Sequence, residues 1–171
     1  TIPIKPNSHI CMECLRECHM AGKVLPRIVG YSVRPQETAA RIEQTGLDET
    51  VITRLVTVFY DHVRSDPALG PIFEARIENW PAHLKRMVDF WSSVALMTGR
   101  YHGTPMQVHV GLPVDESHFE QWLALFRKVA RQVCTPAGAD FVIERAERIA
   151  RSIHLGVYAH ASIPQQARRS N

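Results

Sequence analysis

Residues 48–73, DETVITRLVTVFYDHVRSDPALGPIF, contain the pattern that decides the fold class. In the first part of this stretch, apolar side chains recur every three or four residues, which is typical of an amphipathic helix. Asp48 is a suitable N-cap, and Asp66-Pro67 ends the helix because proline disfavours helical backbone in the residue before it. The stretch therefore predicts a helix over residues 48–65, followed by an apolar turn over residues 70–73.

The same spacing continues downstream and predicts three more substantial helices, over about residues 79–98, 115–135 and 137–159. A short piece over residues 104–112 lies between two prolines and two glycines, and it can hold about two helical turns. No run of alternating β-branched residues competes with this pattern. The sequence therefore predicts an all-α fold.

The chain is expected to have three parts. Residues 1–35 are punctuated by proline and glycine, so any regular element there must be short. We expect an N-terminal extension over residues 1–37, a helical domain over residues 38–160 and a C-terminal tail over residues 161–171. The extension holds a cluster of thiols and one imidazole, namely Cys11, Cys14, Cys18 and His19. They indicate either free thiols on a flexible tail or a metal or redox site.

Composition and charge exclude several classes of function. The 171 residues are 45% hydrophobic and 22% charged, which suits one folded domain with an appendage. The net charge of +3 falls within residues 1–35, and the remainder is neutral, so nucleic-acid binding is not expected. No stretch is apolar enough to insert in a membrane, and residues 1–10 lack the apolar core of a secretory signal. A cytoplasmic location is expected.

Four side chains with polar tips are predicted to enter the helical core. Tyr60 and Trp122 lie on apolar helix faces, while His83 and His109 would enter from two opposite walls. Each alone is most simply a core residue with an ordinary hydrogen-bond partner. Together they indicate that something polar is housed between them, because each buried unsatisfied group would cost ~1–3 kcal/mol. A planar cofactor could lie between the two histidines.

These residues stand in a sequence that resembles the group III truncated haemoglobins over residues 38–158. The resemblance is carried by residues 55–60, 63–73, 80–84, 90–93 and 98–103, by His109, and by Leu112-Pro113, His118-Phe119 and Trp122-Leu123. It implies a truncated globin, in which a two-over-two helical sandwich encloses haem b. Residues 1–35 have no counterpart in the family.

The resemblance also implies a role for each site residue. His109 corresponds to the iron ligand, and Tyr60, His83 and Trp122 correspond to the residues on the opposite, distal side of the haem. Arg86 could reach a haem propionate or simply be solvated. The implied pocket walls are Phe59, Phe73, Leu84, Met87, Phe90 and Leu112.

The implied function is the binding of O₂ and other diatomic ligands. Hydrogen-bond donors at Tyr60 and Trp122 would slow ligand release, which favours nitric oxide, O₂ or peroxide chemistry with an unidentified reductant over O₂ delivery. The enzyme would then be a nitric oxide dioxygenase or peroxidase-like. His83 either binds the iron at rest or only gates access. Two other functions are open: a haem-based sensor acting through the cysteine-bearing extension, and a haem-free helical interaction protein.

Overall fold

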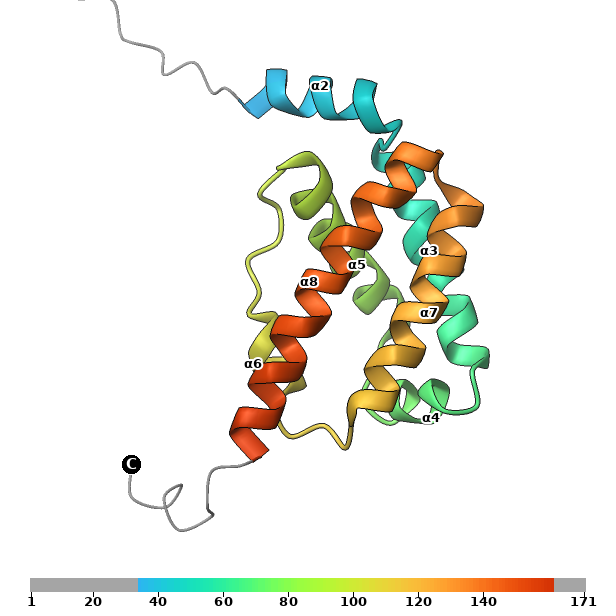
Figure 1. The fold of residues 1–171 in the computed structure, drawn as a ribbon, viewed down its shortest axis with the longest axis vertical. Coiled ribbons are helices and arrows are strands. Elements are labelled where there is room, and N and C mark those ends of the chain that lie inside the picture. Colours follow the sequence, from blue (N-terminus) through green and yellow to red (C-terminus); the bar gives the residue numbers. More distant parts are fainter. Residues whose placement is uncertain (1–33, 162–171) are drawn as a thin grey trace, which may run out of the picture. The chain divides into compact units, whose positions relative to one another are not determined.

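The structure is a computed structural model that describes residues 34–161, a part of the chain that contains helices and no strands. The predicted all-α fold is confirmed (Figure 1). Across these residues, none of the helices combines the length and apolar character needed to cross a membrane. The helices are α2 (Arg34–Thr45), α3 (Glu49–Ser65), α4 (Leu69–Glu74), α5 (Trp80–Leu96), α6 (Pro105–His109), α7 (Glu116–Val133) and α8 (Pro136–Ala161).

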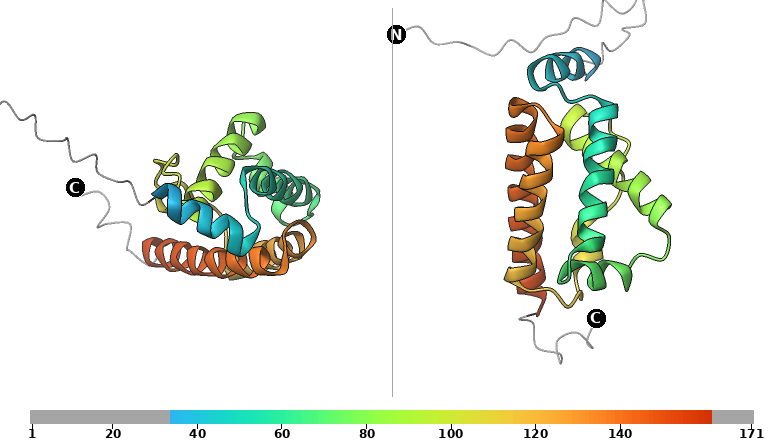
Figure 2. Two further views of the ribbon diagram at one scale, coloured as in Figure 1. Left: turned by 90° about the horizontal axis from the view of Figure 1, so that it is seen from above. Right: turned by 90° about the vertical axis from the view of Figure 1, so that its right-hand side faces the viewer.

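The four long helices α3, α5, α7 and α8 form two layers. Helix α3 packs against α5 in one layer, α7 packs against α8 in the other, and α3 also contacts α7 across the interface. Figure 2 shows the two layers edge-on, with α2 lying across one end, where it contacts α5 and α8. The two-over-two sandwich expected from the sequence is confirmed.

Side-chain caps fix where three of these helices begin. Asp48, Asn79 and Asp115 each accept a hydrogen bond from the backbone N–H three residues further on, at 2.8, 3.0 and 3.3 Å. Such a bond satisfies one of the donors that the first helical turn leaves unpaired. The starts predicted near Asp48, Asn79 and Asp115 are therefore confirmed.

The prediction of a turn over residues 70–73 is wrong, because these residues belong to helix α4. The carboxylate of Asp66 accepts the backbone N–H groups of Ala68 and Leu69, both at 2.9 Å, and so starts a new helix directly after α3. Gly70 permits this tight junction, since a Cβ atom there would lie 2.7 Å from the Arg64 carbonyl oxygen.

Two further differences concern the ends of helices. Helix α5 ends at Leu96 rather than near Thr98, because Met97 takes left-handed backbone with φ 59°. Helix α2 was not predicted, since its sequence is mostly polar. It is held by contacts with the end of α5: the Thr38 hydroxyl donates to the Leu96 carbonyl at 2.6 Å, and Arg41 donates to the Ala95 carbonyl at 3.2 Å. These bonds satisfy carbonyls that α5 itself leaves free.

The core lies between α3, α5, α7 and α8 and is closed only in part. Phe59 and Phe126 are 1% exposed, and Ile52 and Leu55 are fully buried. On α5, Trp91 is buried. Four further side chains of this helix are partly exposed, namely His83, Met87, Phe90 and Val94. Side chains of the inner α5 face thus remain partly uncovered.

Candidate functional site

Tyr60 is buried in α3 and surrounded by rings. Its ring centroid lies 4.9 Å from that of His83 and 6.0 Å from those of Phe73 and Trp80, each in an edge-on arrangement. No hydrogen bond of its hydroxyl is found within the described residues. Burial raises the pKa of Tyr60, so the hydroxyl keeps its proton. The site therefore holds a phenolic donor without a protein partner.

His83 lies next to Tyr60 and carries an unsatisfied buried nitrogen. Its ring stands nearly perpendicular to that of Tyr60, at 88°, and to that of Trp80, at 82°. Nε2 is buried and has no hydrogen-bond partner among the described residues. Burial, with a smaller contribution from the charge of Arg86, lowers the pKa of His83 and favours the neutral imidazole. An orphaned buried nitrogen is costly and calls for another group at this place.

Trp122 reaches the same region from α7. Its ring stacks on Phe126 at 5.2 Å and 8°, and it meets the edge of Phe59 at 5.1 Å. Phe59 in turn touches Tyr60, with 5.2 Å between the centroids. The indole N–H donates no hydrogen bond within residues 34–161. The structure thus places Tyr60 and His83 in contact and joins Trp122 to them through Phe59.

His109 is the last residue of the five-residue helix α6. Its Nδ1–H donates to the Pro105 carbonyl at 2.7 Å, which leaves Nε2 with a lone pair. Helix α6 packs on α8 but has no Cα atom within 8 Å of α5 or α7. His109 and His83 are therefore carried by helices whose Cα atoms lie more than 8 Å apart.

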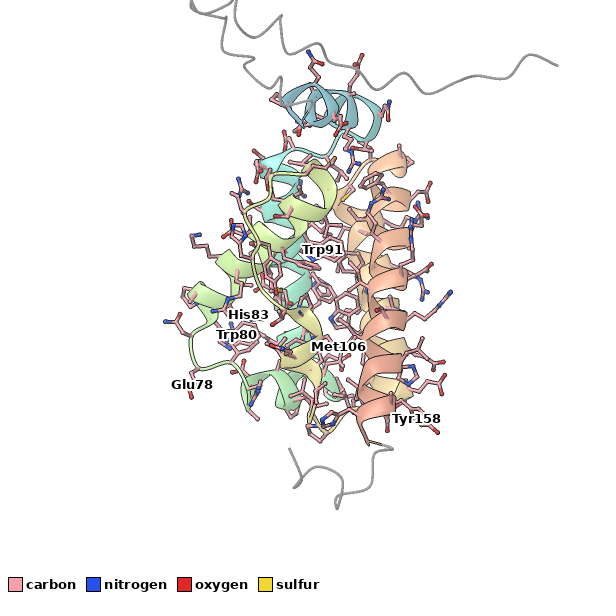
Figure 3. The ribbon with its side chains drawn as sticks, turned by 90° about the vertical axis from the view of Figure 1, so that its left-hand side faces the viewer. Glu78, Trp80, His83, Trp91, Met106 and Tyr158 are labelled. Carbon is pink, nitrogen blue, oxygen red and sulfur yellow. The ribbon has the colours of Figure 1, made fainter. Side chains whose placement is uncertain are left out.

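Helix α6 is positioned by its contact with α8 and by the loop that precedes it. A Cβ atom on Gly156 would lie 2.2 Å from the Met106 sulfur, so the absence of a side chain there lets α6 approach α8. Figure 3 shows Met106 on α6 and His83 on α5. Before α6, Arg100 pairs with Glu49 at 2.6 Å and with Asp89 at 3.1 Å, which ties the loop to α3 and α5.

The residues expected to line the pocket fall into three groups. Phe59 is buried in the core, and Arg86 is exposed. The remaining five are apolar yet partly exposed, namely Phe73, Leu84, Met87, Phe90 and Leu112. A flat, apolar macrocycle that carries a metal ion would cover these apolar side chains, and its metal would bind Nε2 of His109. The residues present therefore fit haem.

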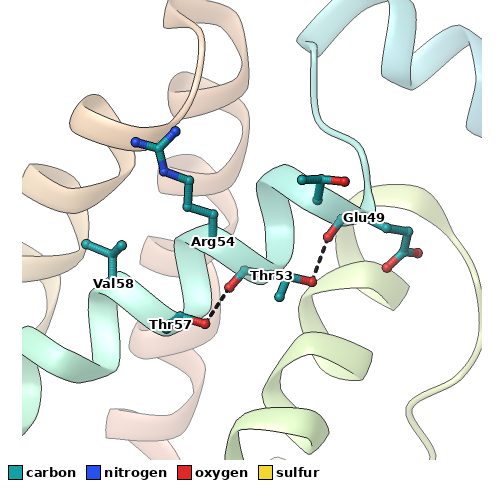
Figure 4. Close-up of a pocket in the computed structure, with 6 residues that line it drawn as sticks. Glu49, Thr53, Arg54, Thr57 and Val58 are labelled. Atoms are coloured by element: carbon teal, nitrogen blue, oxygen red, sulfur yellow. Dashed lines mark hydrogen bonds between the residues drawn. The ribbon is translucent and has the colours of Figure 1, made fainter.

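A shallow groove on α3 lies away from these residues. It is lined by Glu49, Thr53, Arg54, Thr57 and Val58, together with Thr50 (Figure 4). The Thr53 hydroxyl donates to the Glu49 carbonyl at 2.7 Å, and the Thr57 hydroxyl donates to the Thr53 carbonyl at 2.9 Å. Because these hydroxyls are satisfied within their own helix, the groove offers no comparable set of unpaired groups.

Sequence reasoning did not identify Trp80 as a site residue. Its ring contacts both Tyr60 and His83, at 6.0 and 5.7 Å. The available signal was its position three residues before His83, which places both side chains on one face of a helix.

The cysteine cluster of the extension, Cys11, Cys14 and Cys18 with His19, lies outside the described residues. Within residues 34–161, no group of three or more His, Cys, Asp or Glu side chains is placed to hold a metal ion. Cys134 is a free, partly buried thiol, and burial raises its pKa to about 11. Cys134 therefore stays protonated near neutral pH and acts as a small apolar side chain.

The described residues form a two-layer helical sandwich in which two histidines lie on different helices and apolar side chains between them stay partly exposed. These features are typical of the haem-binding globins. The chain belongs to the bacterial-like globin family, whose sequence model matches residues 42–154. It is 32% identical over 119 residues to group 3 truncated hemoglobin ctb of Campylobacter jejuni, a match that covers 67% of this chain and 94% of the relative.

The solved structures agree. The chain is similar to the crystal structure of the group III truncated hemoglobin from Campylobacter jejuni, with a TM-score of 0.63 and 32% identity over 66% of this chain and 92% of that chain. The resemblance and the fold class predicted from the sequence are therefore confirmed. Haem binding follows from membership of the globin family.

Proposed function

We propose that the globin domain holds haem b between α5 and α6, with Nε2 of His109 as the axial ligand of the iron. The observation that carries this proposal is the hydrogen bond from His109 Nδ1–H to the Pro105 carbonyl. It keeps the proton on Nδ1, leaves the lone pair on Nε2 and orients the ring, as hydrogen-bond partners of metal-ligating histidines commonly do. The separation of α5 from α6 supports room for a flat group.

The pocket walls follow from the same placement. The partly exposed apolar side chains Phe73, Leu84, Met87, Phe90 and Leu112 cover the faces of the macrocycle, and Phe59 supports them from the core. Arg86 lies one turn after His83 and is exposed, so its guanidinium can pair with a propionate at the pocket rim.

When bound, a haem iron with one imidazole ligand offers its other axial position to a diatomic molecule. The Tyr60 hydroxyl and the Trp122 N–H are the donors available to such a molecule, because neither is used within the described protein. A hydrogen bond to a charged acceptor contributes ~1.5–3 kcal/mol, so each donor slows release of a polarised ligand about tenfold to a hundredfold. Slow release opposes O₂ delivery and supports chemistry on the ligand.

His83 supplies a neutral imidazole beside these donors. Its lowered pKa keeps the ring neutral, and a neutral imidazole has one nitrogen that can donate a proton and one that can accept. The same nitrogen could instead bind the iron when no other ligand is present. Ligation at rest and gating of access both remain open for this residue.

The partner of His109 favours nitric oxide and O₂ chemistry over peroxide chemistry. A carboxylate bonded to Nδ1–H raises the basicity of the ligating imidazole, which assists O–O cleavage. Here the acceptor is the neutral carbonyl of Pro105. We therefore propose nitric oxide dioxygenation as the main activity, with an electron-donating partner as reductant and a cytoplasmic location. A peroxidase-like activity is the second candidate.

The proposed iron ligand can be tested with a matched control. His62 forms the same kind of bond, with Nδ1–H donating to the Val58 carbonyl four residues earlier at 2.9 Å. We expect the wild type and His62→Ala to show the Soret band of bound haem, and His109→Ala to lose or shift it. An unchanged spectrum in His109→Ala would exclude this residue as the ligand.

The proposed activity is tested by rapid mixing of the reduced, O₂-equilibrated protein with nitric oxide while the iron spectrum is followed. Fast conversion to the ferric spectrum with formation of nitrate is the expected result. Slow conversion, at the rate of O₂ loss, would contradict dioxygenation. The sensor alternative is tested by deletion of residues 1–33, since unchanged ligand kinetics and turnover would count against it. Membership of the globin family weighs against a haem-free interaction protein.

A further inference from the structure

We propose that Trp80 is a positioning residue for His83, held in place by a surface pair, Arg64 and Glu74, that acts as a latch on the distal side. The inference rests on the proposed function of His83 at the haem. We call Arg64, Glu74 and Trp80 the distal latch.

Trp80 is placed to restrain the His83 ring directly. It is the first residue of α5, one turn before His83, and the two rings meet edge-on with 5.7 Å between centroids. His83 also meets Tyr60 at 4.9 Å, and the Tyr60 and Trp80 rings are themselves 6.0 Å apart. Figure 3 shows Trp80 and His83 next to each other on α5. The three rings therefore contact one another, and rotation of the His83 side chain changes its contacts with the other two.

The orientation of Trp80 is fixed by residues from two other helices. Its indole N–H donates to Glu74 Oε2 at 3.1 Å, and Glu74 Oε1 accepts from Arg64 Nε at 2.9 Å. The Arg64 guanidinium also lies over the Trp80 ring, 4.6 Å from its centroid. The hydrogen bonds from Arg64 and Trp80 lower the pKa of Glu74, so the carboxylate stays charged near neutral pH. Each member of the latch thus contacts the other two.

This geometry distinguishes the distal latch from an ordinary surface ion pair. The Arg64 and Glu74 side chains are 48% and 47% exposed, and an exposed pair alone stabilises little. Here the pair joins the end of α3, the end of α4 and the start of α5 through a ring that touches two distal residues. Its effect should therefore appear in the freedom of His83 and in ligand access, more than in overall stability.

The test compares variants of the latch with a matched surface pair elsewhere. Trp80→Leu removes the ring, Trp80→Phe keeps a ring but loses the indole N–H, and Glu74→Ala removes the acceptor. Arg127 and Glu147 form a second exposed pair, at 2.7 Å between α7 and α8, so Glu147→Ala is the control. All variants are made in the full chain and checked for helical content by circular dichroism.

Two readouts report on His83. The first is its rate of modification by diethyl pyrocarbonate, located by mass spectrometry and compared with His62 in the same sample. The second is the CO association rate after flash photolysis of the haem-loaded protein. We expect Trp80→Leu to raise both rates about two- to tenfold, which corresponds to the loss of one aromatic pair. Glu74→Ala and Trp80→Phe should change both in the same direction by less, and Glu147→Ala should leave both unchanged.

Unchanged rates in both Trp80→Leu and Glu74→Ala would overturn the latch, as would an equal change in Glu147→Ala. If Trp80→Leu fails to fold, Trp80→Phe and Glu74→Ala still decide the question, because both retain the protein's packing. Should the wild type take up no haem, the proposed function fails. The modification rate of His83 then still tests the latch by itself.

Discussion

The distal and proximal sides of the proposed haem site rest on helices of very different length. Tyr60, His83 and Trp122 lie on α3, α5 and α7, which have 17, 17 and 18 residues and contribute buried side chains to the core. His109 lies on α6, which has 5 residues and none of them buried. The distal residues thus lie on helices that form the core, whereas the proximal residue lies on a short helix outside the core.

This difference indicates how the two sides acquire their geometry. On the distal side, rings 4.9–6.0 Å apart connect the helices, so close packing of the protein itself orients the side chains. The proximal segment is held mainly at its ends: Arg100 ties the loop before α6, and Asp115 caps the helix after it. Between these points, its position depends on the contact with α8 and, we infer, on the bond to the iron.

The largest expected effect concerns the centre of the distal side. Phe59→Ala removes a ring that is 1% exposed and touches Tyr60, Trp122 and Phe126, so it should lower the free energy of unfolding by ~3–5 kcal/mol. Val108→Ala on α6, where the side chain is 51% exposed, should cost less than ~0.5 kcal/mol. Chemical denaturation of the two variants measures the contrast. Equal losses of unfolding free energy in the two variants would contradict the division into a distal side within the core and a proximal side outside it.

The same division explains what the sequence could predict. Helices α3, α5, α7 and α8 were found because a long amphipathic face is a strong periodic signal, and the capping residue Asp48 marked the start of α3. Helix α4 was predicted as a turn, because a Pro and a Gly suggested a break while the Asp66 carboxylate supplies the missing cap. Helix α2 was missed because its sequence is mostly polar, and it is held by hydrogen bonds to carbonyls of α5 that lie 54 and 58 residues away in sequence.

The candidate site was less accessible from periodicity alone. The positions of His109, Tyr60, His83 and Trp122 in the predicted helices singled them out, but their roles came from the family resemblance and remain predictions. Trp80 was overlooked, because what distinguishes it is a pair of contacts with Glu74 and Arg64 on other helices. Tertiary contacts of this kind leave no spacing pattern in the sequence.

The second largest effect concerns the hydroxyl group of Tyr60 on the distal side. Tyr60→Phe keeps the ring packing and removes only the hydroxyl, so stability should change little while the O₂ dissociation rate rises about tenfold to a hundredfold. Stopped-flow displacement of O₂ by CO measures this rate. Tyr158→Phe, at a tyrosine of α8 that is 68% exposed, is the control and should leave it unchanged. An unchanged rate in Tyr60→Phe would show that the hydroxyl does not donate to the ligand.

The third effect concerns the contact between α6 and α8 on the proximal side, where a larger side chain is introduced at Gly156. In Gly156→Val, the new side chain overlaps the Met106 sulfur, since even a Cβ atom there would lie 2.2 Å from it. The Met106 side chain must then leave this contact, at a cost of up to ~1–3 kcal/mol in unfolding free energy, and because this contact positions α6, His109 should hold haem less firmly. Transfer of haem to apomyoglobin measures the release rate.

A second substitution makes this interpretation specific. Met106→Ala in the Gly156→Val background frees the space that the valine needs, so the double variant should regain stability relative to Gly156→Val alone. Additive losses in the double variant would mean that Gly156 does not act through Met106. The double variant thus shows whether the loss of stability in Gly156→Val arises at the contact between α6 and α8 or within α8 itself.

The smallest effect concerns the far end of the proximal segment and depends on pH. Hydrogen bonds from Ser117 and His118 lower the pKa of Asp115 to about 2 from the ordinary 3.8. Because the pKa is lower in the folded state, the carboxylate stabilises the fold above about pH 4, and this contribution is lost as the pH falls from about 4 to 2. Asp115→Asn keeps the capping ability but cannot titrate, so the stability advantage of the wild type should shrink over that window. Urea unfolding at a series of pH values measures this difference in stability.

Ser117→Ala removes the largest contribution to the pKa shift of Asp115, so its stability should show a pH dependence between those of the wild type and Asp115→Asn. If the difference between wild type and Asp115→Asn stays constant across the window, the charge of Asp115 does not anchor this segment, which is then held by Arg100 and by the contact of α6 with α8.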